Sequence, residues 1–324
     1  MWLRGSLGLW GAGLLLWGLL GGCGEATETD FVWGRSPAWS PDGKVLLFDQ
    51  NVSGPADLTF GVSVSRFNVG FIWKTILSDL DGDGKVDTAA NPQRLTLTGT
   101  DLSPTWDPEG LYVAFVSSQA EHLDIWRMAA DGQGRVPLTN DMAPDREPAW
   151  SPDGTRIAYS SYRQGNWDLW VMNADGSNPT PLTLTPTNET SPAWSPDGKQ
   201  LVFASDRDRG NWDLWIIKVD GTGLRQLTHK EKARSSRVDG APAWSPEGTE
   251  IVYESWEDNW DIWIINADGT NQRQLTDNPD HDGEPVWSPN GQQIAFTSAR
   301  TGWWHVWIMD RDGSNARQIT GREE

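Results

Sequence analysis

The sequence is poor in the residues that most often carry chemistry. Cysteine occurs once, at Cys23, so no disulfide can form within the chain. The four histidines are scattered: His122, His229, His281 and His305. No histidine pair has the spacing of a metal site, and no G-x-S-x-G segment marks a serine nucleophile. We therefore expect a protein that binds rather than one that catalyses.

Basic residues are scarce as well. The 324 residues include 26 Lys and Arg against 45 Asp and Glu, which gives a formal net charge of −19 at pH 7. A surface that binds nucleic acid needs Lys and Arg to neutralise phosphates, so nucleic acid is not an expected partner. The one basic stretch, HKEKARSSR at residues 229–237, is typical of a solvated loop.

The apolar run near the N-terminus is too short to span a bilayer. Residues 7–22 form a run of 16, whereas a membrane-spanning helix needs about 20. With Arg4 before it, this run is typical of the core of a secretory signal peptide. Removing residues 1–22 leaves 25 Lys and Arg against 45 Asp and Glu, so the mature chain is still strongly acidic.

The only cysteine stands where this segment ends. The sequence LGGC, ending at Cys23, resembles the lipobox of bacterial lipoproteins, in which the cysteine receives a diacylglycerol and becomes the mature N-terminus. We expect residues 1–22 to be a lipoprotein signal peptide and residues 23–36 to be a lipidated N-terminus and tether. The protein would then be held by lipid on the extracytoplasmic side of a membrane. The alternative is an uncleaved anchor with an incidental cysteine.

What the sequence has in abundance is repetition. The unit is clearest at residues 148–183, PAWSPDGTRIAYSSYRQGNWDLWVMNADGSNPTPLT. Copies begin at six prolines: Pro37, Pro104, Pro148, Pro192, Pro242 and Pro285. From Pro104 onward they are 44, 44, 50 and 43 residues apart, a spacing typical of four-stranded propeller blades. The first interval is 67 residues, which indicates an insertion in the first copy.

Each unit carries the signals of four short strands. S-P-D-G forms a tight turn after the first strand, and Asp-Gly marks a hairpin after the third. The second and third strands, such as residues 201–204 and 169–172, are apolar on both faces, so each sheet must be covered on both sides. Tryptophans of the third strand would fill the gaps that widen outward between blades: Trp126, Trp170, Trp215, Trp263 and Trp307.

The ends of the repeat array predict a closed ring. The first and last copies show the same two-sided apolar pattern, and neither has the polar outer face of a capping repeat. The sequence therefore predicts an all-β fold, a six-bladed β-propeller of four-stranded antiparallel blades over residues 37–324. Its blades start near residues 37, 104, 148, 192, 242 and 285.

An acidic loop lies in the inserted part of the first copy. Residues 78–87 read SDLDGDGKVD, and carboxylates that alternate around a turn at Gly84 converge on one centre. The predicted Ca²⁺ ligands are Asp79, Asp81, Asp83, Asp87 and the carbonyl oxygen of Lys85. Ala90 stands where an EF-hand has its bidentate Glu, so the loop looks more like those of integrin-type propellers and dockerins. The alternative is a long hairpin with several Asp-Gly turns.

Acids also recur where the first strand of each unit begins. Five copies have one three residues before the proline: Asp101, Asp145, Glu189, Asp239 and Asp282. Because the repeat demands an acid here, we expect it to cap the turn that enters the strand. Glu147 and Glu284, directly before the proline, depart from the repeat and would face each other across one mouth of the axial channel. All seven are predicted partner-binding residues, in a negative funnel that attracts a basic peptide segment or a cation.

The P-A-W-S-P-D-G start, the D-[IL]-W strand and the L-T end resemble the repeat of TolB-type, WD-repeat-like propellers of bacterial envelopes, from Pro37 to Thr320. TolB carries an α/β domain before its propeller, for which residues 24–36 are too few, and binds a peptidoglycan-associated lipoprotein at the channel mouth. The resemblance implies a lipid-anchored, non-catalytic scaffold that binds an envelope protein or a cell-wall ligand. We expect a monomer. Some pectin-degrading lyases use similar repeats, so the alternative is a carbohydrate-active lyase or hydrolase with a metal in its channel.

Overall fold

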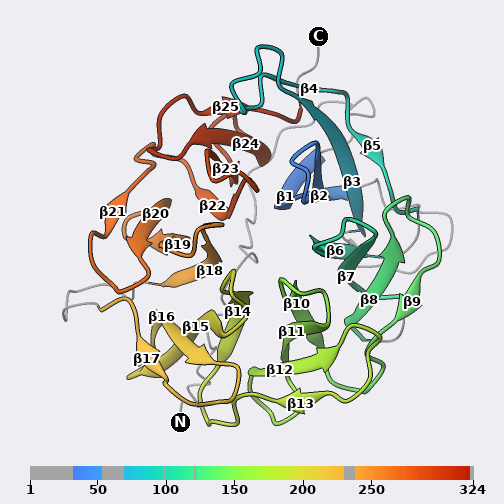
Figure 1. Cartoon of the computed structure of the whole chain (residues 1–324), viewed down its shortest axis with the longest axis vertical. Coiled ribbons are helices and arrows are strands. Elements are labelled where there is room, and N and C mark those ends of the chain that lie inside the picture. Colours follow the sequence, from blue (N-terminus) through green and yellow to red (C-terminus); the bar gives the residue numbers. More distant parts are fainter. Residues whose placement is uncertain (1–31, 53–68, 98–99, 120–121, 230–237, 322–324) are drawn as a thin grey trace, which may run out of the picture.

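The computed structural model describes residues 32–52, 69–97, 100–119, 122–229 and 238–321. These residues form six antiparallel β-sheets arranged in a ring, which confirms the predicted six-bladed propeller (Figure 1). Within these ranges, no helix is long and apolar enough to cross a membrane. The expected signal peptide, Cys23 and residues 230–237 of the basic stretch lie outside the described residues.

Every blade runs from an innermost first strand to a last strand at the rim. The innermost strands are β1 (Val32–Trp39), β6 (Asp101–Trp106), β10 (Asp145–Trp150), β14 (Glu189–Trp194), β18 (Asp239–Trp244) and β22 (Asp282–Trp287). The second strands are β2 (Val45–Val52), β7 (Tyr112–Ser117), β11 (Arg156–Ser161), β15 (Gln200–Asp208), β19 (Glu250–Trp256) and β23 (Gln293–Ser298). The third strands are β3 (Val69–Ser78), β8 (Asp124–Ala129), β12 (Asp168–Asn173), β16 (Asn211–Lys218), β20 (Trp260–Asn266) and β24 (His305–Asp310). The rim strands are β4 (Thr88–Ala89) and β5 (Gln93–Arg94) in the first blade, then β9 (Val136–Pro137), β13 (Thr180–Pro181), β17 (Arg225–Gln226), β21 (Arg273–Gln274) and β25 (Arg317–Gln318).

The first blade starts earlier than the repeat indicates. Its innermost strand β1 begins at Val32, where it pairs with Val52 of β2. Residues 32–36, expected in the tether, therefore belong to the propeller. The expected boundary at residue 37 is wrong because the proline marks the middle of the innermost strand, not its beginning.

A β-bulge interrupts every innermost strand at that proline. In the third blade the register shifts between Arg146 and Ala149, so Glu147 and Pro148 together face one residue of β11. The residue before the proline, here called the bulge residue, has φ between 43° and 55° in all six blades. Left-handed backbone is unfavourable for residues other than glycine, so a bulge repeated six times is a built part of the fold. It turns the backbone amide of the bulge residue away from its own sheet.

The S-P-D-G turn is held by its own side chains. Ser151 Oγ donates to Asp153 Oδ1 over 2.6 Å and accepts from the backbone amide of Arg156 over 2.9 Å. Gly154 has φ of 69°, which glycine adopts without strain. The hydroxyl of Ser151 and the amide of Thr155 lower the pKa of Asp153 to about 2. The recurring aspartate therefore stabilises the turn as an ionised acceptor and is not a site.

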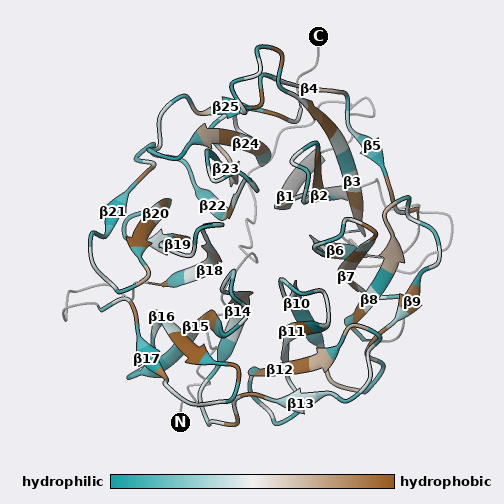
Figure 2. Cartoon of the chain, viewed as in Figure 1, coloured by the Kyte–Doolittle hydropathy of each residue, from teal (hydrophilic) through white to brown (hydrophobic). Residues whose placement is uncertain are grey.

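The hydrophobic core lies between blades. Each of the six junctions has its own cluster of buried side chains, and Figure 2 shows hydrophilic rim strands such as β17 and β21 outside them. The closing junction joins Leu46 and Phe48 of the first blade to Val306 and Ile308 of the sixth, each at most 1% exposed. The expected tryptophans pack against the clusters: Trp126, Trp170, Trp215, Trp263 and Trp307. The strands that are apolar on both faces thus pack against a neighbouring blade on each side, and this packing closes the ring as predicted.

The insertion of the first blade adds polar contacts to this closure. The loop between β3 and β4 reaches the sixth blade, where the amide of Val86 donates to Gln293 Oε1 over 2.8 Å. Next to it, Lys85 Nζ pairs with Asp310 Oδ2 over 2.8 Å. The acidic loop is therefore part of the junction between the two ends of the repeat array.

Candidate functional site

The five recurring acids begin the innermost strands but do not reach the surface. All are 0% exposed: Asp101, Asp145, Glu189, Asp239 and Asp282. Their burial does not favour direct contact with a docked partner, although Asp239 lines the pocket described below. Partner binding by these five residues stays a prediction. These acids were also expected to cap the turn that enters the strand. Instead, the carboxylates of Asp101, Asp145 and Asp282 accept hydrogen bonds from side chains.

Arginines neutralise four of these acids. Arg135 binds Asp101 through two contacts of 2.7 and 3.0 Å. Single contacts of 3.2, 2.9 and 2.8 Å join Arg163 to Asp145, Arg207 to Glu189 and Arg300 to Asp282. Each guanidinium also lies 4.5–6.0 Å from the ring centre of the third-strand tryptophan of its blade. A buried carboxylate, an arginine and a tryptophan ring therefore connect the first and third strands of each of these blades.

Glu147 and Glu284 lie on innermost strands half a ring apart, as expected (Figure 1). Each carboxylate accepts a hydrogen bond from the bulge residue of the next blade. The amide of Ser191 donates to Glu147 Oε2 over 2.6 Å, and the amide of Ser36 donates to Glu284 Oε2 over 2.6 Å. Ser160 Oγ also donates to Glu147 Oε2 over 2.9 Å. Both glutamates are partly exposed, and each joins its blade to the next one.

Two further carboxylates make the same connection and were missed in the sequence. Asp49 Oδ1 and Glu254 Oε2 accept the amide of the bulge residue of the next blade over 3.3 and 2.9 Å. Each directly follows an apolar run of its second strand, LLF before Asp49 and IVY before Glu254. A Cβ on Gly240 or Gly283 would lie 3.1 or 2.7 Å from the Glu254 carboxylate, so these glycines clear its space. An acid in an apolar strand was the signal that could have found them.

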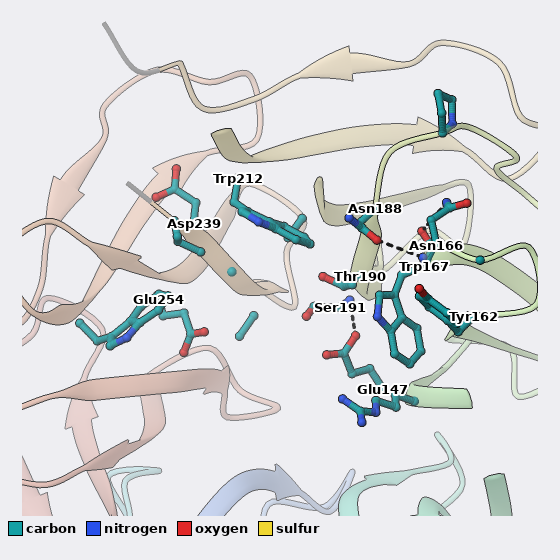
Figure 3. Close-up of a pocket in the computed structure, with 18 residues that line it drawn as sticks. Glu147, Tyr162, Asn166, Trp167, Asn188, Thr190, Ser191, Trp212, Asp239 and Glu254 are labelled. Carbon is teal, nitrogen blue, oxygen red and sulfur yellow. Dashed lines mark hydrogen bonds between the residues drawn. The ribbon is translucent and has the colours of Figure 1, made fainter. Parts of the chain in front are cut away.

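A pocket of about 400 Å³ opens beside the channel between the third, fourth and fifth blades. It is lined by the innermost strands β10, β14 and β18, by residues between second and third strands such as Tyr162, and by residues just before innermost strands such as Asn188 and Val238. In Figure 3 the carboxylates of Glu147 and Glu254 approach the pocket from opposite sides. Two of the seven predicted partner-binding residues line it: Glu147, which is partly exposed, and Asp239, which is buried.

Aromatic side chains form much of the wall: Tyr162, Trp167, Trp212 and Trp260. Trp167 meets Tyr162 edge to face with ring centres 5.3 Å apart, and the Arg146 guanidinium lies 5.1 Å from its ring centre. Asn188 Oδ1 accepts the amide of Trp167 over 3.2 Å, which fixes the rim. The wall therefore combines an apolar surface with polar groups that are held in place, a combination typical of ligand-binding sites.

The groups in the pocket suit binding rather than bond cleavage. Neither histidine, cysteine nor lysine is among the described residues that line it. The carboxylates of Glu147 and Glu254 are engaged as acceptors of backbone amides, which fixes them in place. Together they attract a cation, whereas the aromatic wall covers its apolar neighbours.

The acidic loop lies between β3 and β4, far along the chain from this pocket. Carboxylate oxygens of Asp79, Asp81 and Asp87 come within 4.8 Å of one another, whereas Asp83 is outside the group. Asp83 Oδ1 instead accepts the backbone amide of Lys85 over 2.8 Å. Three of the four predicted aspartate ligands are thus brought together, and calcium binding by the loop stays a prediction.

Calcium is expected to stabilise the propeller if the loop binds it, because the loop contacts the sixth blade at the ring closure. With a dissociation constant of about 10⁻⁴–10⁻³ M, a tenfold excess of Ca²⁺ would add roughly 1.4 kcal/mol. Melting curves measured with Ca²⁺ and with a chelator test this. Equal midpoints, unchanged by Asp81→Ala, would rule calcium out, and Asp197→Ala, in an exposed turn of another blade, is the control.

Comparison with known proteins places this geometry in a family. The family model of the TolB beta propeller domain, PD40, matches residues 84–185 and 233–324. A curated relative is the Tol-Pal system protein TolB of Anaeromyxobacter dehalogenans, 31% identical over 110 residues. That match covers 34% of this chain and 20% of the relative, so the chain spans about a fifth of the length of the curated relatives it matches.

Solved structures agree in fold. The putative TolB of Agrobacterium tumefaciens has a TM-score of 0.61 and 26% identity, over 80% of this chain and 87% of that one. An oligogalacturonate lyase in complex with manganese has a TM-score of 0.56 at 15% identity, over 89% and 77%, which shows likeness of fold alone. From the six repeats, the closed ring and the family model, we conclude that this chain belongs to the TolB beta propeller domain family.

Proposed function

We propose that the protein is a lipid-anchored envelope scaffold that binds a protein partner in the pocket between the third, fourth and fifth blades. The observation that carries the proposal is the pocket itself, in which fixed carboxylates and aromatic side chains converge at one end of the channel. The family supports binding rather than catalysis, because its curated relatives are named for the Tol-Pal system. The lyase alternative draws no support from the described lining, which holds one arginine and no histidine.

The charge of the pocket favours a basic segment of the partner. Glu147 and Glu254 face the pocket, and the chain as a whole carries a net charge of −19. A field of one sign attracts a segment of the opposite sign and speeds its association. The basic loop at residues 230–237, an alternative docking element, lies outside the described residues.

A lipid on Cys23 would turn the pocket toward the membrane. The innermost strand β1 begins at Val32, on the same side of the ring as the segments that enter the other innermost strands and form the pocket rim. Nine residue steps separate Cys23 from Val32, which reach at most about 30 Å. A partner anchored in the same membrane, or exposed near its surface, would therefore be within reach.

The anchor itself has a direct test. Membrane-extracted protein is expected to have a mature N-terminus at a diacylglycerol-modified Cys23, and Cys23→Ser is expected to move nearly all of the protein to the soluble fraction. Mass spectrometry and fractionation measure the two results. An N-terminus at Met1, or membrane retention of Cys23→Ser, contradicts lipid anchoring but leaves the pocket proposal standing.

Partner binding is tested by removing the charge of the pocket while keeping its hydrogen bonds. The double variant Glu147→Gln, Glu254→Gln retains an acceptor oxygen for each backbone amide, and we expect it to weaken partner capture from envelope extract roughly tenfold at low salt. Its salt dependence should also flatten. The matched control, Glu109→Gln with Glu247→Gln, removes the same charge from exposed turns at the opposite face. Equal losses in both variants would show a non-specific effect of net charge and contradict the proposal.

A further inference from the structure

One type of hydrogen bond recurs at the junctions between neighbouring blades. At four of them, a carboxylate of one blade accepts the backbone amide of the next blade's bulge residue. The pairs are Asp49 with Ser103, Glu147 with Ser191, Glu254 with Glu284, and Glu284 with Ser36, over 3.3, 2.6, 2.9 and 2.6 Å. The carboxylate comes either from the bulge residue or from a fixed position of the second strand.

The junction between the fourth and fifth blades lacks this carboxylate. The bulge residue of the fifth blade is Ala241, with φ of 43°. The two positions of the fourth blade that would supply the acceptor are Ser191 and Ala204, and neither bears a carboxylate. Within the described residues, no side chain accepts a hydrogen bond from the Ala241 amide. Ala241, Ser191 and Ala204 all line the pocket, so the missing acceptor and the pocket occupy the same place.

A second junction provides an internal comparison. Between the second and third blades, the corresponding positions are Ser103 and Val116, again without a carboxylate. Val116 is 2% exposed within a hydrophobic cluster, and no residue of the second blade lines the pocket. A ligand in the pocket can therefore reach the amide of Ala241 from the fourth blade, whereas the junction before the third blade is closed to it.

We propose that an extended peptide completes the ring here, with a backbone carbonyl oxygen on the amide of Ala241 and a lysine or arginine side chain between Glu147 and Glu254. A carbonyl is favoured over a carboxylate because both glutamates repel a further negative charge, whereas a neutral acceptor beside a cation is compatible with them. Trp212 and Trp260 would cover the apolar part of the peptide. This deepens the proposed function and rests on it.

The amide of Ala241 reports the interaction directly. The probe is N-acetyl-arginine N-methylamide, titrated into isotope-labelled protein, and the measurement is the amide proton shift of Ala241. We expect a saturable downfield shift at Ala241 that exceeds any shift at Ser103 or Ser191, because their amides already have acceptors. N-acetyl-glutamate N-methylamide should bind more weakly. A glutamate probe that binds equally well, or an arginine probe that saturates without moving Ala241, overturns the proposal.

A variant can supply the missing acceptor from the protein. Ala204→Asn places a neutral side-chain oxygen at the second-strand position that Asp49 uses, so we expect it to shift the Ala241 amide downfield without a ligand. It should weaken the arginine probe by about three- to tenfold, the value of one hydrogen bond. Val116→Asn, at the same position of the second blade, should leave the affinity unchanged. If either variant fails to fold, the wild-type titration still decides.

The contact at Ala241 and the binding of a partner in the pocket can be disproved separately. If the envelope partner binds and depends on Glu147 and Glu254, but Ala204→Asn leaves its affinity unchanged, the carbonyl contact at Ala241 is wrong and the proposed function stands. If neither the arginine probe nor the partner depends on the pocket residues, the proposed function fails as well.

Discussion

Replacing Asp101 by alanine is expected to lower the free energy of unfolding by about 3–5 kcal/mol, because it removes the buried carboxylate that the guanidinium of Arg135 contacts twice. Asp101 is 0% exposed, and the Arg135 side chain is only 17% exposed. The arginine lies between the rings of Phe115 and Trp126, 5.0 and 6.0 Å from their centres, where water cannot replace the two lost contacts fully. Denaturant unfolding monitored by tryptophan fluorescence measures the effect.

Two controls separate the ion pair from other causes. Asp101→Ala combined with Arg135→Met removes both charges, so it should be clearly less destabilising than Asp101→Ala alone. Lys199→Ala breaks an exposed pair with Asp197, whose side chains are 78% and 52% exposed, and should change the free energy of unfolding by less than about 1 kcal/mol. If Asp101→Ala is as mild as Lys199→Ala, the recurring acid has no role in holding the innermost strand.

The melting temperature is expected to rise as the pH falls from about 8 to about 5. Three aspartates in the first two positions of third strands have their pKa raised to about 6, chiefly by burial: Asp124, Asp168 and Asp261. A neighbouring buried acid, Asp145, Glu189 or Asp282, raises each pKa further. Their carboxylates take up protons in the folded protein near pH 6, while the unfolded chain keeps them ionised down to about pH 4.

Folding therefore binds protons in this window, and these three groups make the protein more stable as pH falls through 6. The gain levels off below about pH 4, where the unfolded chain is protonated too. There, groups with a lowered pKa begin to lose their contribution, and Asp153, with a pKa of about 2, is one of them. A stability maximum near pH 4–5 should result. Asp124→Asn, Asp168→Asn and Asp261→Asn combined should flatten the rise, whereas a flat wild-type profile above pH 5 would contradict the burial of these charges.

The fold could be predicted because local and global signals agree. Each S-P-D-G turn is built from a serine and an aspartate that form a hydrogen bond with each other, as Ser151 and Asp153 do. The residues that define the motif are therefore the ones that hold the turn. Two-sided apolar strands required neighbours on both faces, and the closing cluster around Leu46 and Val306 supplies them. Regular spacing then set the number of blades.

The site was harder to predict because a periodic sequence pattern does not show how deeply each side chain is buried. The recurring acids looked like a funnel, yet Asp101 and Asp282 lie beneath the surface, and their arginine partners come from elsewhere in the blade. Glu254 was hidden in an apolar strand, and its role depends on the amide of Glu284 in the next blade. The pocket includes Ala204 and Ser191, positions at which some other blades carry an acid, and this difference is seen only when the blade junctions are compared.

The central claim, that a partner docks at the pocket end of the channel, is tested most directly by photo-crosslinking in cells. A photoreactive amino acid at position 186 stands in the exposed part of the pocket lining, and one at position 224 stands at the opposite face, where Leu224 is 44% exposed. We predict an ultraviolet-dependent adduct of one defined mass from position 186, lost when Glu147→Gln and Glu254→Gln are added, and none from position 224. An adduct that forms equally from both positions, or persists without the two glutamates, would contradict the account.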